Sequence, residues 1–369
     1  MPIPSLPNEL IDQILSYECL KEEDLQTACL VSKSWLEPSR RSLYHSIDLY
    51  LRRIEPCDGP LSPPRITYRL DTASWQLFSV LNQKPGLAAM VKEINLMQTT
   101  SVEDIPSIMF TTPADLLSSL FLLLPNASSF SFDTDEWFAG EAYGSLLPHL
   151  DRIQTLNMED FDEDRWFQLA VRIPDLRSLH VRCFAEETSL NRSTPSKSRL
   201  ESLVVELDCV KNFKALTFGS KLSLRSLTIQ QNLVHALDLS QFPNLLQLSI
   251  HAAFLSSQRI SKDVTPFLGT LRDSTSLVKI RFPSSFIKTH DGSYPGFHGH
   301  LPLSCRRIDI DRFWTVNEIV AATQKRYGSQ LAQLGLTYAV KGQGKRKLLV
   351  AGARAVAEEA GVEIIWLDG

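Results

Sequence analysis

Three histidines in one glycine-rich stretch are the residues of this chain best placed to bind a metal ion. His290, His298 and His300 lie in THDGSYPGFHGH, and imidazole is a common zinc ligand. A zinc site also needs a further ligand and groups that orient the imidazoles, and only Asp291 lies at supporting spacing. We therefore expect a loop insertion without a metal. A metal-dependent hydrolase that uses these histidines is the most distant alternative function.

Two other segments have the composition of binding loops but lack the required spacing. EDFDED at 159–164 alternates carboxylates, yet it has neither the glycine nor the distal glutamate of a calcium loop. KGQGKRK at 341–347 lacks the GxxxxGK(S/T) frame of a phosphate-binding loop. No GxSxG frame for a nucleophilic serine occurs either. The sequence predicts a chain that is not an enzyme and holds no cofactor and no metal.

Composition and charge exclude several classes of partner. The 369 residues are 43% hydrophobic and 22% charged, which is ordinary for a globular protein. The net charge of −4 comes from the first fifty residues, with four Lys/Arg against eight Asp/Glu, so no basic excess indicates a nucleic-acid partner. The six cysteines form no CxxC pair and no apolar run reaches the length of a membrane span, and we expect no signal peptide. We expect a cytoplasmic or nuclear protein without a membrane partner.

The first fifty residues are patterned as a docking surface. LPNELIDQILSY at 6–17 places apolar residues at helical spacing, and ACLVSKSWLEPSRRSLYHSI follows at 28–47. We expect three helices, beginning near Asn8, Glu22 and Ser32 or Ser34, with Pro38 interrupting the third. Three helices in about forty residues bury too little apolar surface to be stable alone. The sequence therefore predicts that another surface covers them.

This segment closely resembles an F-box. The matching features are Leu6-Pro7, the helix at 9–15, the run at 29–35 and Arg40-Arg41, within residues 3–47. The resemblance implies binding to a Skp-family adaptor, which links F-box proteins to the cullin and RING subunits of a ubiquitin ligase. The residues that it assigns to adaptor binding are Leu6, Pro7, Leu10, Ile11, Ile14, Leu15, Leu30, Val31 and Trp35. The alternative is a small helical bundle that only packs on the following domain.

An apolar-x-x-apolar-x-apolar unit recurs after residue 43. The clearest units begin at Leu176, Leu200, Leu224 and Leu245, at spacings of 24, 24 and 21 residues. Weaker units begin at Tyr44, Val91, Ala127, Ile153, Leu277, Cys305, Leu331 and Val362. The spacing resembles a leucine-rich repeat. The F-box-plus-repeat arrangement resembles proteins that are abundant in mushroom-forming fungi.

Stacking explains how such small units fold. Each unit supplies a short strand with one apolar side, and neighbouring units share these sides. The predicted fold class is α/β: a short three-helix F-box over 1–47, then over 44–369 an irregular leucine-rich-repeat solenoid with a curved parallel sheet and outer helices. We expect 54–67, with its four prolines, to be a loop.

Two features concern the regularity of the stack. The repeat's asparagine position holds Asn232 in one unit but Phe184 and Asp208 in others, so no continuous asparagine ladder is expected. In the last unit we expect Ile365 and Leu367 to point inward and the strand to cap the sheet edge.

Alternation along each strand leaves a second set of residues pointing outward. A polar strip of mixed charge suits recognition of a protein or peptide, and an acidic or phosphorylated segment would fit its basic members. The candidate target-binding residues are His180, Arg182, Glu206, Gln230, His251, Lys279, Arg281, Arg307 and Asp309.

The sequence therefore leads to one main hypothesis for function. We expect a substrate receptor that binds a Skp-family adaptor through the F-box and an unknown protein target through the repeats. A scaffold that binds the adaptor without joining a ligase is the main alternative.

Overall fold

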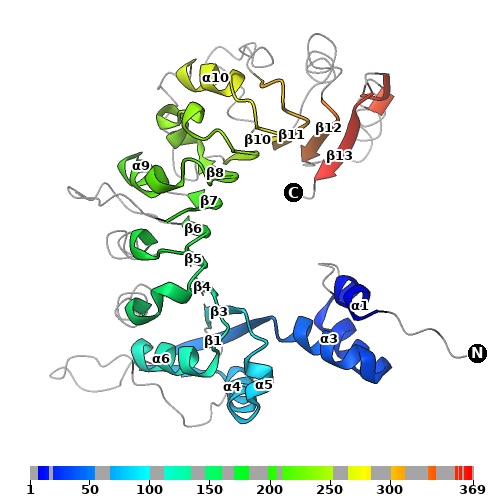
Figure 1. Ribbon diagram of the computed structural model, residues 1–369, viewed down its shortest axis with the longest axis vertical. Coiled ribbons are helices and arrows are strands. Elements are labelled where there is room, and N and C mark those ends of the chain that lie inside the picture. The colour runs from blue at the N-terminus through cyan, green and yellow to red at the C-terminus, as the bar shows by residue number, and fades with distance from the viewer. Residues whose placement is uncertain are drawn as a thin grey trace, which may run out of the picture. The chain divides into compact units, whose positions relative to one another are not determined.

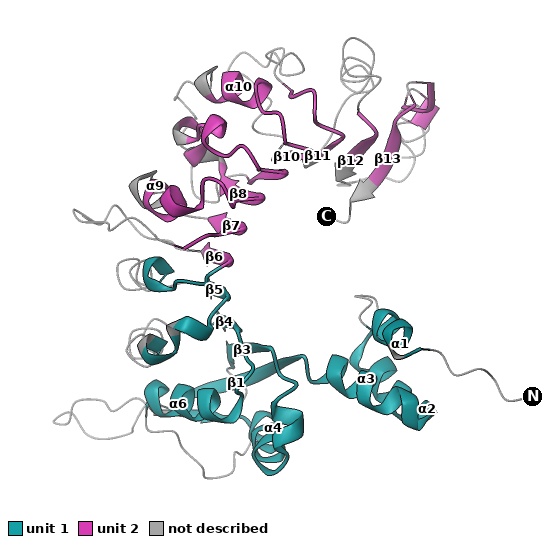
Figure 2. Cartoon of the chain, in the orientation of Figure 1, with its two compact units in different colours: residues 1–176 teal, residues 177–369 magenta. Residues whose placement is uncertain are grey.

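The structure is a computed structural model, and it forms two compact units, residues 1–176 and 177–369 (Figures 1 and 2). The residues that it describes are 7–15, 20–54, 67–99, 112–133, 146–159, 170–182, 198–205, 210–251, 265–283, 301–311, 331–337, 354–355, 357–359 and 361–367. Each unit is treated separately below. The predicted segments, an F-box over 1–47 and a repeat region over 44–369, do not coincide with these two units, and their boundaries stay predictions.

Unit 1 opens with three helices, as predicted: α1 (Asn8–Leu15), α2 (Glu22–Val31) and α3 (Lys33–Leu43). The expected interruption at Pro38 is wrong, because α3 continues through it to Leu43. Pro38 and Ser39 are buried, and α3 packs against both other helices. This packing offsets the backbone hydrogen bond that proline cannot donate.

The helices of unit 1 lead directly into a sheet. Its strands are β1 (Ser46–Ile54), β2 (Thr67–Leu70), β3 (Glu93–Gln98), β4 (Ser129–Asp133) and β5 (Thr155–Glu159), in the order β2-β1-β3-β4-β5. The pairs are parallel except at the edge, where β2 runs antiparallel to β1. A fully parallel sheet was expected, so β2 was missed. Of the predicted loop at 54–67, both end residues belong to strands, and 55–66 lie outside the described residues.

Helices connect the strands of unit 1, and local capping fixes where they begin. The connecting helices are α4 (Thr72–Gln83), α5 (Pro85–Ala88), α6 (Pro113–Leu123) and the 3-10 helix η1 (Leu147–Arg152). The Asp71 carboxylate accepts from the Ser74 amide at 2.7 Å and begins α4. The Thr112 hydroxyl accepts from the Asp115 amide and begins α6, with Pro113 in the first helical position.

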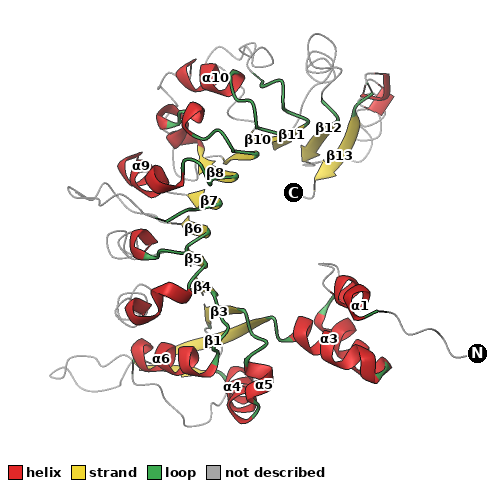
Figure 3. Ribbon diagram, viewed as in Figure 1, coloured by secondary structure: helices red, strands yellow, loops and turns green. Residues whose placement is uncertain are grey.

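Unit 2 alternates parallel strands with helices (Figure 3). Its strands are β6 (Ser178–Arg182), β7 (Ser202–Val205), β8 (Ser226–Gln230), β9 (Gln247–His251), β10 (Lys279–Pro283), β11 (Arg307–Asp311), β12 (Gln333–Thr337) and β13 (Glu363–Leu367), paired in that order. The helices whose bounds the structure describes in this unit are α9 (Val210–Thr217), α10 (Thr265–Arg272) and the 3-10 helices η2 (Phe218–Ser220), η3 (Gln231–Ala236) and η4 (Leu239–Gln241). Each unit thus contains a mostly parallel sheet with connecting helices.

The strand register confirms the predicted apolar positions within unit 2 as far as β12. Leu203 pairs with Leu227, and Ile280 pairs with Ile308. All four are at most 1% exposed. The last unit is wrong by one residue, because Leu334 pairs with Ile364 and not with Ile365. A slip of one residue exchanges the two faces of a strand, so Ile364 takes the place expected for Ile365.

Successive strands are joined by a repeated backbone hydrogen-bond pattern. In unit 1 the amides of Lys92 and Glu93 both donate to the His45 carbonyl, at 2.8 and 3.0 Å. In unit 2 the amides of Arg306 and Arg307 both donate to the Val278 carbonyl, at 2.9 and 3.1 Å. The same pairing recurs at the carbonyls of Lys92, Ser128, Arg177, Glu201, Arg225, Leu246 and Arg306.

Serine side chains add a second link between neighbouring strand units of unit 2. The hydroxyls of Ser223, Ser276 and Ser304 donate to the carbonyls of Leu200, Leu245 and Leu277, at 2.9, 2.9 and 2.8 Å. Each serine directly precedes the first apolar residue of its own unit, and each carbonyl belongs to the first apolar residue of the preceding one. These hydroxyls satisfy backbone groups that the turns leave unpaired.

Candidate functional site: apolar helices and a polar strand face

The three helices of unit 1 share a very small core. Ile11 and Leu15 of α1 pack with Ala28 of α2, and Leu20, Leu25 and Trp35 lie against them, partly buried. The Arg41 guanidinium donates to both carboxylate oxygens of Asp12 at 3.2 Å and joins α3 to α1. Sequence reasoning missed this ion pair, because 29 residues separate its partners.

Four large apolar side chains of these helices are exposed. Leu10 and Ile14 of α1 are 44% and 42% exposed, and Leu30 and Val31 of α2 are 86% and 62% exposed. Leu10 and Ile14 are four residues apart and therefore lie on one face of α1. We call Leu10, Ile14, Leu30 and Val31 the exposed apolar set. Apolar side chains concentrated on such a short segment indicate an interaction surface.

The residues predicted to bind the adaptor therefore fall into four groups. Pro7 is exposed, and its carbonyl accepts from the amides of Leu10 and Ile11 at the start of α1. Ile11 and Leu15 are 0% and 4% exposed, so they build the bundle core, as Trp35 partly does. Leu6 lies outside the described residues. Pro7 and the exposed apolar set are the described residues of this prediction that remain available to a partner.

Residues 3–50 match the F-box-like family. The match spans all three helices, the exposed apolar set and the first residues of β1. The chain therefore carries an F-box-like domain at residues 3–50. No curated protein matches the chain.

The predicted target-binding residues all belong to unit 2, and the structure brings four of them together. Lys279 and Arg281 of β10 lie opposite Arg307 and Asp309 of β11 in the register. His180 lies on β6, with β7, β8 and β9 between it and β10. Gln230 and His251 pair across β8 and β9, and Arg182 lies on β6, although its side chain is not described. Glu206 lies outside the described residues.

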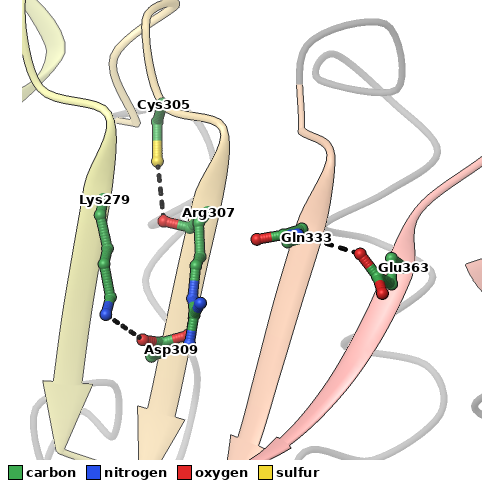
Figure 4. Close-up of polar contacts among 6 residues, drawn as sticks. All are labelled: Lys279, Cys305, Arg307, Asp309, Gln333 and Glu363. Carbon is green, nitrogen blue, oxygen red and sulfur yellow. Dashed lines mark hydrogen bonds and ion pairs between the residues drawn. The ribbon is translucent and has the colours of Figure 1, made fainter. Parts of the chain in front are cut away.

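Two of these residues are buried where exposure was expected. Gln230 is 8% exposed, and η3 begins at the next residue. Asp309 is 2% exposed, although strand alternation places it on the outward face. The cause is visible in Figure 4, where Lys279 and Arg307 extend along their strands to the Asp309 carboxylate. Gln230 and Asp309 are therefore not exposed contact residues.

Asp309 is the centre of an ion-pair cluster. Its Oδ1 accepts from Arg307 Nε at 2.8 Å, and its Oδ2 lies 3.3 Å from Lys279 Nζ. The Lys279 and Arg307 side chains remain 36% and 26% exposed. A buried carboxylate needs such partners, because leaving its charge unpaired in the interior is costly.

Cys305 lies beside this cluster but has the properties of a structural residue. Burial raises the pKa of its thiol to about 12, and the nearby Asp309 charge adds to this effect. Its Sγ donates to the Arg307 carbonyl at 3.4 Å (Figure 4). A thiol held protonated at neutral pH is a poor nucleophile.

The segments considered above for metal or phosphate binding fall mostly outside the described residues. These are the three histidines at 290–300, residues 160–164 of the acidic run, and 341–347. Within the part of the chain that is described, no cluster of three His, Cys, Asp or Glu residues is arranged to hold a metal ion. None of the described helices combines the length and apolar character that crossing a bilayer requires.

Proposed function

We propose that this chain is the substrate-receptor subunit of a cullin-RING ubiquitin ligase of the SCF type. The F-box-like domain would bind a Skp-family adaptor, and the strand region would bind a protein target. The observation that carries the proposal is the F-box-like match at residues 3–50, because F-box domains generally bind such adaptors. In this proposal the chain performs no covalent chemistry itself and acts in the cytoplasm or nucleus.

The exposed apolar set supports the docking part of the proposal. Leu30 alone is 86% exposed at the end of α2, and three more large apolar side chains lie on the same two helices. Fully burying one such side chain stabilises a complex by roughly 1.5–3 kcal/mol before the costs of association. An adaptor with an apolar groove would therefore gain most of its affinity from these residues.

The strand region supports the presentation part. We propose that the strand region is a leucine-rich-repeat solenoid, as in the fungal F-box proteins that the chain resembles. Its repeated apolar pattern and its repeated backbone hydrogen bonds between strands support this proposal. Neighbouring units share buried apolar residues and hydroxyl-to-carbonyl links, such as Ser304 to Leu277. A stack held this way presents an outward strand face without a large rearrangement.

Co-purification with a Skp-family adaptor tests this proposal. Wild-type chain and adaptor, co-expressed, should elute as one complex. Leu30→Asp should abolish the complex, because it places a charge in the apolar contact. Leu122→Asp is the matched control, since Leu122 is 83% exposed on α6, outside the F-box-like domain. A complex that survives Leu30→Asp as well as Leu122→Asp would contradict the assigned surface.

Addition of a cullin separates the ligase receptor from a scaffold that binds the adaptor alone. We expect the cullin to join the complex of chain and adaptor on a sizing column. An adaptor complex that excludes the cullin would contradict the ligase role while leaving adaptor binding intact.

A further inference from the structure

We propose that an apolar edge of unit 2 binds an amphipathic helix of the protein target, with a carboxylate at each end of that helix pairing with an arginine. This inference rests on the proposed function, since it names the class of target segment that the receptor would recognise. Binding at this edge is testable without the adaptor.

Exposed apolar side chains gather where the chain enters four neighbouring strands. Among the described residues of unit 2, five large apolar side chains are exposed, and four of them lie within four residues of the start of β8, β9, β10 or β11. These strands are parallel neighbours, so the segments that enter them lie at one edge of the sheet. Such a gathering marks an interaction surface. The four are Leu222 (73% exposed), Leu246 (40%), Val278 (38%) and Leu303 (69%), and we call them the apolar edge.

Hydrogen bonds link the members of the apolar edge across successive strand units. The Val278 amide donates to the Leu246 carbonyl at 2.8 Å, so these two residues occupy equivalent positions in neighbouring units. The Leu222 carbonyl accepts from the Asn244 side chain of the next unit at 2.7 Å. The serine that follows Leu303 donates to the carbonyl of the residue before Val278, at 2.8 Å. The apolar edge therefore connects four successive units.

The backbone of this edge favours a helix over an extended strand as the bound segment. The carbonyls of Arg225, Leu246, Val278 and Arg306 each accept two amides of the next unit, at 2.8 to 3.1 Å, and their own amides donate to the preceding unit. An added strand would find no free backbone partner here and would bury its own polar groups unpaired. A helix pairs its backbone groups internally and contacts such a surface through side chains alone.

Two arginines determine the charge of the expected partner. Arg225 and Arg306 occupy the positions equivalent to Leu246 and Val278 in the two flanking units, and both are exposed. Neither arginine has an ion-pair or side-chain hydrogen-bond partner among the described residues. They are the only charged residues in the segments that form the edge, which are 222–225, 243–246, 275–278 and 303–306.

Two acidic residues close to these segments in the chain leave the arginines available. Glu201 occupies the position equivalent to Arg225 in the preceding unit, and its carboxylate lies 3.8 Å from Arg177. Asp273 follows α10, and within the described part of the chain no ion pair joins it to Arg225 or Arg306. Each arginine can therefore pair with one carboxylate of a ligand. A second copy of the chain fits less well, because a two-fold pair of such edges would place arginine against arginine.

The distance between the arginines gives the length of the helix. Three strand spacings separate Arg225 from Arg306, or roughly 14–15 Å. Three turns of α-helix rise about 16 Å and return to the same face after eleven residues. Two aliphatic residues between the acidic ones, at the fourth and seventh positions, share this face and would lie on Leu246 and Val278. The expected target segment is acidic-x3-aliphatic-x2-aliphatic-x3-acidic.

Fluorescence anisotropy on the full-length chain tests the inference. The probe is a fluorescein-labelled peptide with this pattern of glutamate and leucine, held helical by a lactam bridge on its opposite face, and its counterpart carries lysine in place of both glutamates. We expect only the glutamate peptide to bind. Val278→Asp should weaken this binding about tenfold or more, because it places a charge at the centre of the apolar contact. Val80→Asp is the matched control, since Val80 on α4 is 37% exposed.

Reversal of charge tests the two arginines separately from the apolar contact. The double variant Arg225→Glu, Arg306→Glu should bind the glutamate peptide about tenfold more weakly and should bind the lysine peptide, which the wild-type chain does not. Arg354→Glu, at an exposed position before β13, is the control and should leave both affinities unchanged.

Several outcomes would overturn the inference. These are no binding of the glutamate peptide to the wild-type chain, equal binding of the two peptides, and equal losses in Val278→Asp and Val80→Asp. Should Val278→Asp fail to fold, Leu303→Asp is the second variant, and unchanged affinity there would overturn the apolar contact. Equal binding of a proline-containing peptide that cannot form a helix would overturn the helix. Self-association of the wild-type chain in sedimentation, without peptide binding, would overturn the target helix in favour of a second copy.

The result is distinguishable from a failure of the proposed function. Val278→Asp should co-purify with the adaptor as wild type does, while Leu30→Asp should bind the glutamate peptide normally. Adaptor binding without peptide binding overturns the apolar edge alone. Peptide binding without adaptor binding overturns the receptor role.

Discussion

The F-box-like helices and the strands differ in how far they bury apolar residues of the same types. Leu227 and Ile280, at inward strand positions, are completely buried. Leu30 and Val31, at the end of α2, are 86% and 62% exposed. Leu122 on α6 is 83% exposed, close to the value for Leu30, but no other large apolar side chain described in α6 is exposed. The strands bury their apolar residues in the fold, and the helices leave four of theirs available to a partner.

Geometry explains this difference. A strand inside a stack has neighbours on both sides, so each inward side chain is covered by those of two adjacent units. The helical bundle has only three short elements, and its core consists of Ile11, Leu15 and Ala28. So few residues cannot cover every apolar face of three helices. A small domain with exposed apolar residues is therefore suited to docking, and a stack is suited to presentation.

Truncation in the strand core should have the largest effect on stability. Phe130 of β4 is 1% exposed, and its ring lies 4.8 Å from that of Phe121 of α6. Phe130→Ala should lower the free energy of unfolding by about 3–5 kcal/mol, because the cavity has no way to collapse fully. Urea denaturation measures this. Ser129 is the preceding residue and is half-buried. Ser129→Ala should change the free energy of unfolding by no more than about 0.5 kcal/mol relative to wild type. A loss below about 1 kcal/mol in Phe130→Ala would mean that the strand core is not tightly packed.

Substitution by alanine at two neighbouring positions of α1 should distinguish a core residue of the helical bundle from an exposed one. Ile11→Ala should destabilise the F-box-like domain by about 2 kcal/mol, at the low end for buried aliphatic residues, because the bundle core is small. Leu10→Ala, on the neighbouring exposed position, should change stability by no more than about 0.5 kcal/mol. Hydrogen exchange over residues 8–31 measures both. Equal protection in the two variants would break the distinction between core and exposed apolar residues in α1.

Removal of a serine link between strand units should have a smaller effect. Ser304→Ala deletes the hydroxyl that donates to the Leu277 carbonyl at 2.8 Å and should cost about 1 kcal/mol. Thr275→Val is the control, because it also deletes one hydroxyl, from a threonine that is exposed in the preceding turn. Chemical denaturation of unit 2 reports the difference. Identical midpoints for the two variants would show that the hydroxyl link adds nothing to the stack.

The smallest effect concerns the ion pair between α1 and α3. Arg41 and Asp12 are 52% and 43% exposed, so water screens their attraction. A double-mutant cycle with Arg41→Ala and Asp12→Ala should give a coupling free energy below about 1 kcal/mol, decreasing as salt is added. A larger, salt-independent coupling would show that the bundle depends on this pair more than on its apolar core.

Strand positions followed from the sequence because each clear unit repeats the same apolar-x-x-apolar-x-apolar pattern, although the distance between units varies. Leu203, Leu227 and Leu248 occupy equivalent places in the register, as their spacing predicted. The prediction was wrong in the last unit because Ile364, Ile365 and Trp366 are consecutive apolar residues, so the pattern fits either register. Gly361, with a φ of 68°, precedes this strand in a turn that only the structure reveals.

Burial at the candidate sites was less predictable. Leu10 and Ile11 are both apolar residues at helical spacing, and only the packing of α2 and α3 decides that one is exposed and the other buried. Asp309 was expected on the surface, since alternation cannot show that Lys279, 30 residues earlier, will cover its carboxylate. The F-box-like domain itself was predictable, because several separate motifs occur there in the correct order.

Calorimetric titration of the Skp-family adaptor into the purified full-length chain tests the central claim most directly. We predict binding with a negative heat-capacity change, as burial of apolar surface requires. This binding should be lost in Leu30→Asp and retained in Leu122→Asp. Equal affinities and heat-capacity changes for the two variants would contradict the claim that the exposed apolar residues of α1 and α2 form the docking surface.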